Sequence, residues 1–172
     1  MPVFISYRQK DRQVAFAISE KFRANNIKYY LDVVDEESLT TDDITSVITK
    51  NIQRCTHLIA VISANTKGSW WVPFEIGEAT IISRRICSYA YKTEGAPLLR
   101  STIDIYKSFL PEYLHKWPIL VNERDIDAFI RQYKSDKEES ITLESLGSIS
   151  SRLESLSARG ADQFHKNLKA SL

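Results

Sequence analysis

Short apolar runs alternate along the chain with longer segments in which apolar residues recur every three or four positions. The runs cover residues 3–6, 27–31, 58–63, 86–91 and 117–121. Continuous apolar runs of this length predict strands that are buried on both faces of a sheet. Between the first two runs, Val14, Ile18 and Phe22 share one face of a predicted helix, which Asn25 and Asn26 end.

Strands that alternate with helices predict βαβ units, whose right-handed crossovers cover both faces of a mostly parallel sheet. We therefore expect an α/β, flavodoxin-like fold with a five-stranded parallel sheet. A helix is expected over residues 125–133. The composition then shifts to Ser, Glu and Lys, and two more helices are expected over residues 142–156 and 161–172. We divide the chain into a sheet domain, residues 1–134, and a C-terminal helical extension, residues 135–172.

Charge and hydropathy narrow the class of protein. The 23 basic and 22 acidic residues leave a formal net charge of +1, which gives no bulk electrostatic argument for binding nucleic acid or an anionic membrane. No apolar run approaches the ~20 residues of a membrane span. The first residues lead directly into a predicted strand without a basic region, so we expect no signal peptide. The expectation is a cytoplasmic protein without a nucleic-acid or membrane partner.

The cysteines and histidines do not form a recognisable metal site. The two cysteines, Cys55 and Cys87, lie at or in predicted strands, which favours free, buried thiols over a disulfide. The three histidines, His57, His115 and His165, are too scattered to predict shared ligands. We therefore expect no bound metal.

Several catalytic signatures of α/β proteins are missing. The five glycines are scattered, and neither G-x-G-x-x-G nor a phosphate-binding loop occurs, which argues against a dinucleotide-binding oxidoreductase and an NTPase. A phosphoacceptor receiver would need acidic residues where the first and third strands end, and Tyr7 and Ser63 occupy those positions. There is no G-x-S-x-G elbow. Asp11, in the loop after the first strand, is expected to cap the next helix.

The strongest candidate for chemistry is the segment 69–75. It follows the strand 58–63 across a short polar loop and opens a helix. Ligands of α/β sheets bind just beyond the carboxyl ends of strands, which is where Glu75, flanked by Trp71 and Phe74, is expected. A carboxylate beside aromatic surface suits a site that cleaves a cofactor. It can equally be an acid that favours the positive end of its helix, with the aromatic residues serving packing.

Three segments carry a resemblance to a known family. Residues 3–8 resemble the first strand of Toll/interleukin-1 receptor (TIR) domains, and residues 27–32 resemble their second strand, which leads into the so-called BB loop. Ser69-x-Trp71-x-x-x-Glu75 resembles the motif of TIR domains that cleave NAD+. The resemblance covers roughly residues 2–133, and the BB loop here lacks the usual Gly or Pro.

The resemblance implies roles for individual residues. It implies that Glu75 is the catalytic glutamate. The substrate-binding residues that it implies are Ser6, Tyr7, Arg8, Asp32, Ser69, Trp71 and Phe74. The first three would lie at the mouth of the cleft, and the two aromatic residues would help to form its wall.

The resemblance also implies an activity. The chain is similar to standalone bacterial TIR proteins of Thoeris-like antiphage systems, which make a nucleotide messenger from NAD+ and pass it to a separate effector protein. Cleavage of the nicotinamide–ribose bond releases a neutral leaving group through an oxocarbenium-like transition state, so a single carboxylate suffices. NAD+ is then the substrate, and no cofactor is expected. Water, an internal atom or an added small molecule as nucleophile would give ADP-ribose, a cyclic product or a conjugate.

A second hypothesis is a non-catalytic TIR adaptor that acts as a scaffold through TIR–TIR self-association. Both hypotheses predict self-association. The acidic loop after Asp32, residues 33–40, is usually a solvated segment, and in this fold it is also a natural lid or self-association loop. The carboxylate of Glu75 favours the enzyme, because a scaffold has no need of it.

Overall fold

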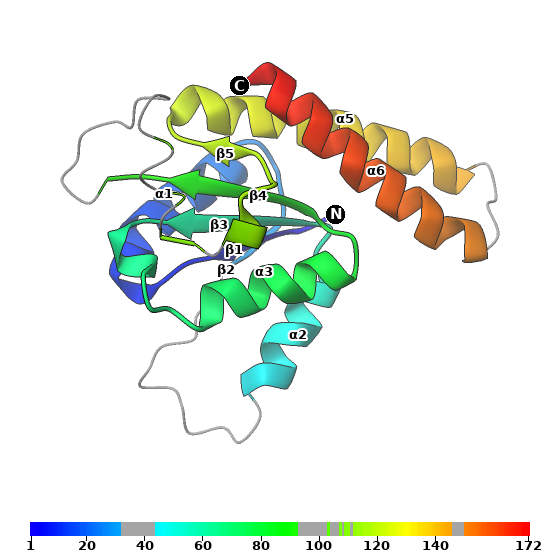
Figure 1. The fold of residues 1–172 in the computed structure, drawn as a ribbon. Coiled ribbons are helices and arrows are strands. Elements are labelled where there is room, and N and C mark those ends of the chain that lie inside the picture. Colours follow the sequence, from blue (N-terminus) through cyan, green and yellow to red (C-terminus); the bar gives the residue numbers. More distant parts are fainter. Residues whose placement is uncertain (32–43, 93–102, 104–106, 108, 111, 146–149) are drawn as a thin grey trace.

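The computed structural model contains one parallel sheet, flanked by helices (Figure 1). It describes all residues except 32–43, 93–102, 104–106, 108, 111 and 146–149. The five strands lie in the order β2-β1-β3-β4-β5, which confirms the flavodoxin-like α/β prediction. They are β1 Val3–Ser6, β2 Tyr29–Leu31, β3 His57–Ile62, β4 Arg85–Ala90 and β5 Ile119–Leu120. The main helices are α1 Arg12–Ala24, α2 Ile44–Arg54, α3 Trp71–Ile81, α5 Glu123–Ser145 and α6 Ser150–Ser171.

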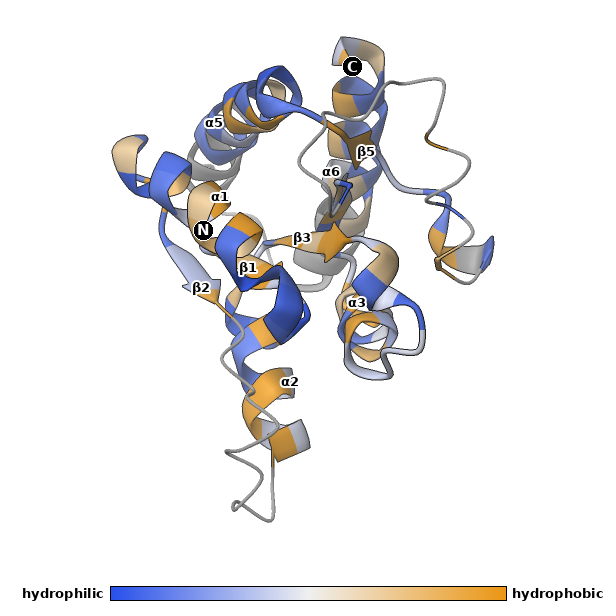
Figure 2. Cartoon of the chain, turned by 90° about the vertical axis from the view of Figure 1, so that its left-hand side faces the viewer, coloured by the Kyte–Doolittle hydropathy of each residue, from blue (hydrophilic) through white to orange (hydrophobic). Residues whose placement is uncertain are grey.

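Two layers of helices cover the two faces of the sheet. Helices α1, α5 and α6 share one hydrophobic cluster with the strands, and α2 and α3 share the other. Figure 2 shows hydrophobic residues in β1, β3 and β5, and hydrophilic residues along much of α5. Because side chains alternate along a strand, Val3 and Ile5 enter the first cluster and Phe4 enters the second.

The parallel register brings three strand ends to one edge. Ser6 at the end of β1 pairs with Ala60 of β3, and Ile62 at the end of β3 pairs with Ala90 at the end of β4. The loops that leave these strands therefore start side by side. This carboxyl edge is where an α/β sheet places its ligand.

The helix α1 ends as its sequence predicts. It stops at Ala24, and Asn26 adopts a left-handed conformation with φ of 56°. The helix α3 ends before the turn that leads into β4. It ends at Ile81, because Ser83 turns the chain with φ of 53° and Arg85 already belongs to β4.

The C-terminal helices are longer than expected. Helix α5 is continuous from Glu123 to Ser145 and passes through the expected domain boundary at residues 134 and 135. The expected bounds 142–156 and 161–172 are wrong, because α6 begins at Ser150 and passes through Gly160. A Cβ at Gly160 would lie 2.6 Å from Nη2 of Arg85. Glycine thus lets α6 approach β4 closely, despite its low helix propensity.

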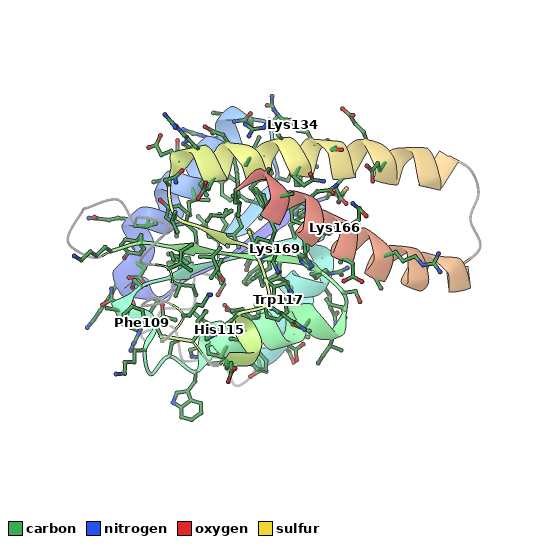
Figure 3. All side chains as sticks on the ribbon, turned by 45° about the horizontal axis from the view of Figure 1, so that its top comes forward. Phe109, His115, Trp117, Lys134, Lys166 and Lys169 are labelled. Carbon is green, nitrogen blue, oxygen red and sulfur yellow. The ribbon has the colours of Figure 1, made fainter. Side chains whose placement is uncertain are left out.

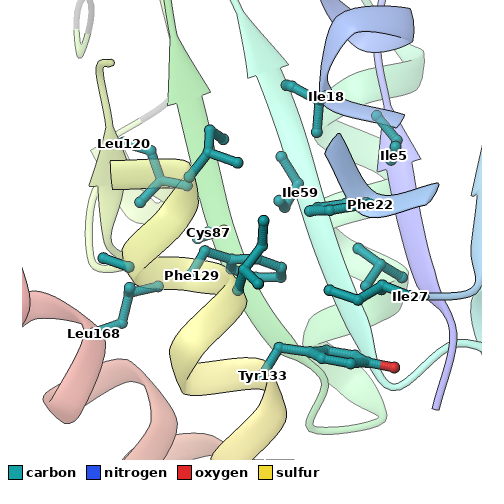
Figure 4. Close-up of a cluster of buried hydrophobic side chains, with 14 of the residues drawn as sticks. Ile5, Ile18, Phe22, Ile27, Ile59, Cys87, Leu120, Phe129, Tyr133 and Leu168 are labelled. Carbon is teal, nitrogen blue, oxygen red and sulfur yellow. The ribbon is translucent and has the colours of Figure 1, made fainter. Parts of the chain in front are cut away.

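Helix α6 completes the core on its face of the sheet. Phe164 and Leu168 are 1% and 0% exposed and lie in the same cluster as Phe129 and Tyr133 of α5. Figure 4 shows Leu168 on the side of this cluster that α6 covers. The fully buried His57 of β3 lies among the rings of Phe129, Tyr133 and Phe164, with centroid distances of 5.9, 4.9 and 4.9 Å. The sheet domain is therefore closed by residues of the expected extension.

Burial determines the charge state of His57 and the pairing of its neighbour Arg85. Desolvation, and to a lesser degree the nearby Arg85, holds the pKa of His57 well below its usual value, so the imidazole is neutral at neutral pH. Arg85 instead pairs with Asp136 of α5, with 3.1 Å between Nε and Oδ2. This buried ion pair fixes α5 to the first residue of β4. Cys55 and Cys87 are both free and buried, as predicted.

We predict that Phe164→Ala lowers the free energy of unfolding by about 3–5 kcal/mol, because it removes a buried ring and leaves a cavity. Urea denaturation measures this change. The matched control is Gln163→Ala on the exposed side of α6, with an expected change within about 0.5 kcal/mol. Equal stability of the two variants would mean that α6 is not part of the cooperative core.

Candidate functional site

A buried contact at the carboxyl edge joins the last residue of β1 to the helix α3. Oγ of Ser6 donates a hydrogen bond to Oε2 of Glu75, and both residues are 0% exposed. The pleat of β1 explains the contact, because Ser6 lies two residues after Phe4 and therefore faces the layer that contains α3. Two residues separated by 69 positions in sequence meet here, and both belong to the predicted site.

The start of α3 positions the carboxylate and two aromatic rings. Oγ of Ser69 accepts a long hydrogen bond, 3.5 Å, from the backbone N–H of Val72 in the first turn. The rings of Trp71 and Phe74 meet edge to face with 6.0 Å between centroids. Trp71 is 36% exposed, whereas Phe74 is half-buried against the second hydrophobic cluster. The first turns of α3 thus present an aromatic surface next to the buried Glu75.

The contacts shown for the predicted residues Tyr7 and Arg8 are with other parts of the chain than Glu75. Tyr7 packs against the first hydrophobic cluster, on the face opposite to Ser6. The guanidinium of Arg8 donates to the backbone carbonyls of Asn65 and Lys67 and so holds the loop between β3 and α3. Asp32 and the acidic loop that follows it lie outside the described residues. The substrate contacts of these residues stay predictions.

Sequence reasoning missed the main polar centre of this edge, which is Asp11. Asp11 occupies the N-cap position of α1, as predicted, but its side chain makes no capping hydrogen bond there. The carboxylate is 1% exposed and accepts from Oγ of Ser63 at 3.0 and 2.9 Å, from the amide of Asn65, and from the hydroxyl of Tyr91 at 2.6 Å. Burial and the bond to Asp11 raise the pKa of Tyr91. Asp11 therefore ties together the chain segments that leave β1, β3 and β4.

A signal for this cluster was present in the sequence. Ser63 and Tyr91 are the last residues of two predicted strands and directly follow the observed β3 and β4. Parallel strands end at a common edge of the sheet. Polar side chains at such positions need partners when they are buried. A helix cap is a sufficient local role for Asp11. The spacing of residues does not show that its carboxylate binds Ser63, Asn65 and Tyr91, which are distant in sequence.

The chemical group that Glu75 offers at this site is a buried carboxylate. Across the described part of the chain, no group of three or more His, Cys, Asp or Glu side chains is arranged to hold a metal ion. In that same part, no helix is long and apolar enough to cross a membrane. A buried carboxylate oriented by a hydroxyl can stabilise positive charge that develops nearby, provided that the substrate reaches it.

Three comparisons with known proteins were made, against protein families, curated proteins and solved structures. A family model described as TIR domain matches residues 3–102, which is more than half of the 172-residue chain. The TIR domains in the structure of the activated Roq1 resistosome directly recognizing the pathogen effector XopQ are similar, at 17% identity and a TM-score of 0.46, covering 99% of this chain and 82% of that chain. A diflavin flavoprotein A3 from Nostoc sp. is similar at 12% identity and a TM-score of 0.41, covering 99% of this chain and 95% of that chain. No curated protein matches the sequence.

We predict that Asp11→Ala destabilises the fold by about 3 kcal/mol, because it leaves the buried donor of Ser63 and the half-buried donors of Asn65 and Tyr91 without their charged acceptor. Urea denaturation gives the change. Asp127→Ala is the control, since this aspartate is 54% exposed and its pairing with Lys21 is solvent-screened. A loss no larger than that of the control would show that Asp11 does not organise this edge.

Proposed function

The chain belongs to the TIR domain family, and on this premise we propose that it is an NAD+ glycohydrolase or ADP-ribosyl cyclase. The family includes both NAD-cleaving enzymes and scaffolds. The observation that supports the enzyme is the contact of Glu75 with Ser6 beside the rings of Trp71 and Phe74, at the ligand-binding edge of the sheet. A carboxylate with an oriented oxygen and an adjacent aromatic surface matches the needs of this reaction.

The proposed reaction needs no further catalytic group to expel the leaving group. The bond between C1′ of the ribose and the nicotinamide nitrogen breaks, and its electron pair leaves with neutral nicotinamide. The carboxylate of Glu75 stabilises the positive charge on the ribose, as in glycoside hydrolysis, and accepts hydrogen bonds from the ribose hydroxyls. Ser6 orients the carboxylate, and the exposed part of Trp71 offers a flat surface for a ring of the substrate.

The burial of Glu75 adds a condition to this proposal. A side chain that is 0% exposed cannot contact NAD+ until a neighbouring segment moves. We infer that the described conformation is a resting one, and that self-association uncovers the site. Trp70, adjacent to the site at the start of α3, is 88% exposed and is a candidate contact between copies. Turnover per subunit should then rise with protein concentration.

The proposed product is an ADP-ribose derivative, cyclic or conjugated, that acts on a separate effector protein in bacterial antiphage immunity. This extension rests on the similarity to Thoeris-like TIR proteins. The alternative is a non-catalytic scaffold that self-associates through TIR–TIR contacts. One observation favours it: a buried Ser–Glu hydrogen bond also serves as a clamp between β1 and α3.

We predict that Glu75→Gln reduces nicotinamide release from NAD+ by at least about 100-fold, because the amide keeps an acceptor for Ser6 but loses the negative charge. Mass spectrometry detects nicotinamide and the mass of the second product. Glu78→Gln is the matched control, one turn further along α3, and should retain activity. Thermal unfolding of both variants checks that the fold is intact.

Two results would contradict the proposal that the protein is an enzyme with Glu75 as its catalytic residue. Nicotinamide release that persists in Glu75→Gln would move the chemistry to another residue. No release by the wild type, at any protein concentration or with extract of infected cells, would favour the scaffold.

A further inference from the structure

A cavity of about 500 Å³ lies at the edge of the sheet opposite to Glu75, where β4 begins. Its wall combines the end of α3 and the turn after it, the segment that precedes β5, and the helix α6. Lys166 and Lys169 project from α6 near Trp117 (Figure 3). This volume lies within the range of sites for small molecules.

The cavity concentrates positive charge in a protein that is almost neutral. Four cationic side chains line it, Arg84, Lys116, Lys166 and Lys169, against the single carboxylate of Asp162. The whole chain has a formal net charge of only +1. Among the described residues, none of these four cations has a carboxylate oxygen within 4.0 Å. Their mutual repulsion is therefore not relieved by ion pairs within the described protein.

Three of the four cations are held in place by other contacts. Nη2 of Arg84 donates to the backbone carbonyl of Gln53, and Nζ of Lys169 donates to the backbone carbonyl of Lys116. Nζ of Lys116 lies 4.6 Å from the ring centroid of Trp117, in a cation–π contact. Nε of Arg84 is buried and has no acceptor among the described residues, so the guanidinium has hydrogen-bonding capacity left for an oxyanion.

His165, which also lines the cavity, adds no charge at neutral pH. Its Nε2 accepts the backbone N–H of Ile86 at 2.8 Å, and desolvation lowers its pKa to about 4. The rest of the wall is apolar except for the hydroxyl side chains of Thr80 and Ser83. Ile86 and Trp117 are 1% and 7% exposed, and Ala161 contributes a small side chain. The cavity thus suits a ligand with a strongly anionic part and a compact organic part.

We propose that this cavity binds a phosphorylated small molecule with at least two negative charges, which bridges the end of α3 and the helix α6. The concave shape and the near-neutral net charge favour a small molecule over a nucleic-acid strand, which is recognised through an extended basic surface. The cavity is separate from Glu75, and the proposal goes beyond the proposed function. Its test measures ligand binding and stability, so the result does not depend on whether the protein cleaves NAD+.

The experiment compares the wild type with the double variant Lys166→Gln/Lys169→Gln. Isothermal titration calorimetry measures the dissociation constants of pyrophosphate and of ADP, and thermal unfolding measures the stabilisation by each. The double variant should bind both probes at least tenfold more weakly. Lys134→Gln is the matched control, an exposed lysine on α5 outside the cavity, and should bind as the wild type does (Figure 3).

The outcomes separate the sources of the phosphate. Equal affinity for the two probes supports a site for the phosphate groups alone, and tighter binding of ADP supports a nucleotide-like ligand. Three results overturn the proposal: no binding of either probe at about 10 mM, binding that the double variant retains, or a single-stranded oligonucleotide that binds more tightly than ADP and loses affinity in the same variant.

Discussion

Every central strand of this sheet is covered on both faces, and that constraint decides which side chains meet at its carboxyl edge. Along β1 the pleat sends Val3 and Ile5 to the layer of α1, α5 and α6, and Phe4 and Ser6 to the layer of α3. A shift of one residue would exchange the two sets and place an apolar side chain against Glu75. The register of a short strand therefore fixes the candidate catalytic contact.

The same constraint concentrates the polar groups. A strand that is buried on both faces has no solvent-exposed face, so its polar side chains lie where the strand ends. Two buried clusters result. Ser6 and Glu75 join β1 to α3, while Asp11 joins the segments that leave β1, β3 and β4. The Asp11 cluster also fixes the loop that leads into α3, because Asn65 binds both Asp11 and Arg8. The position of the candidate carboxylate thus depends on a second carboxylate that takes no part in the proposed chemistry.

The sequence predicted what local patterns determine. The strands follow from continuous apolar runs, and the end of α1 follows from Asn26, a residue that tolerates positive φ. The roles of Asp11 and Gly160 depend on partners far away in sequence, and local rules assigned Asp11 to a helix cap. The packing of His57 among rings of α5 and α6 could not be predicted from the sequence either, because it depends on how the two helices pack together. In the candidate site, spacing identified Glu75, and the register of β1 supplied Ser6 as its partner.

The helix α3 connects the two charged regions of the molecule. Near its start it carries the buried Glu75, and the residues just beyond its end lead into Arg84 of the basic cavity. Its middle is anchored by Val72, Ile76 and Ala79, which are 0%, 1% and 0% exposed. A well-packed helix moves as a unit, since its apolar side chains cannot shift separately without leaving voids. Uncovering Glu75 therefore requires movement of the loops and side chains around the start of α3, or displacement of the whole helix against β3 and β4. In the second case, any ligand that holds the end of α3 to α6 would oppose the movement, and the state of the basic cavity would affect access to the carboxylate.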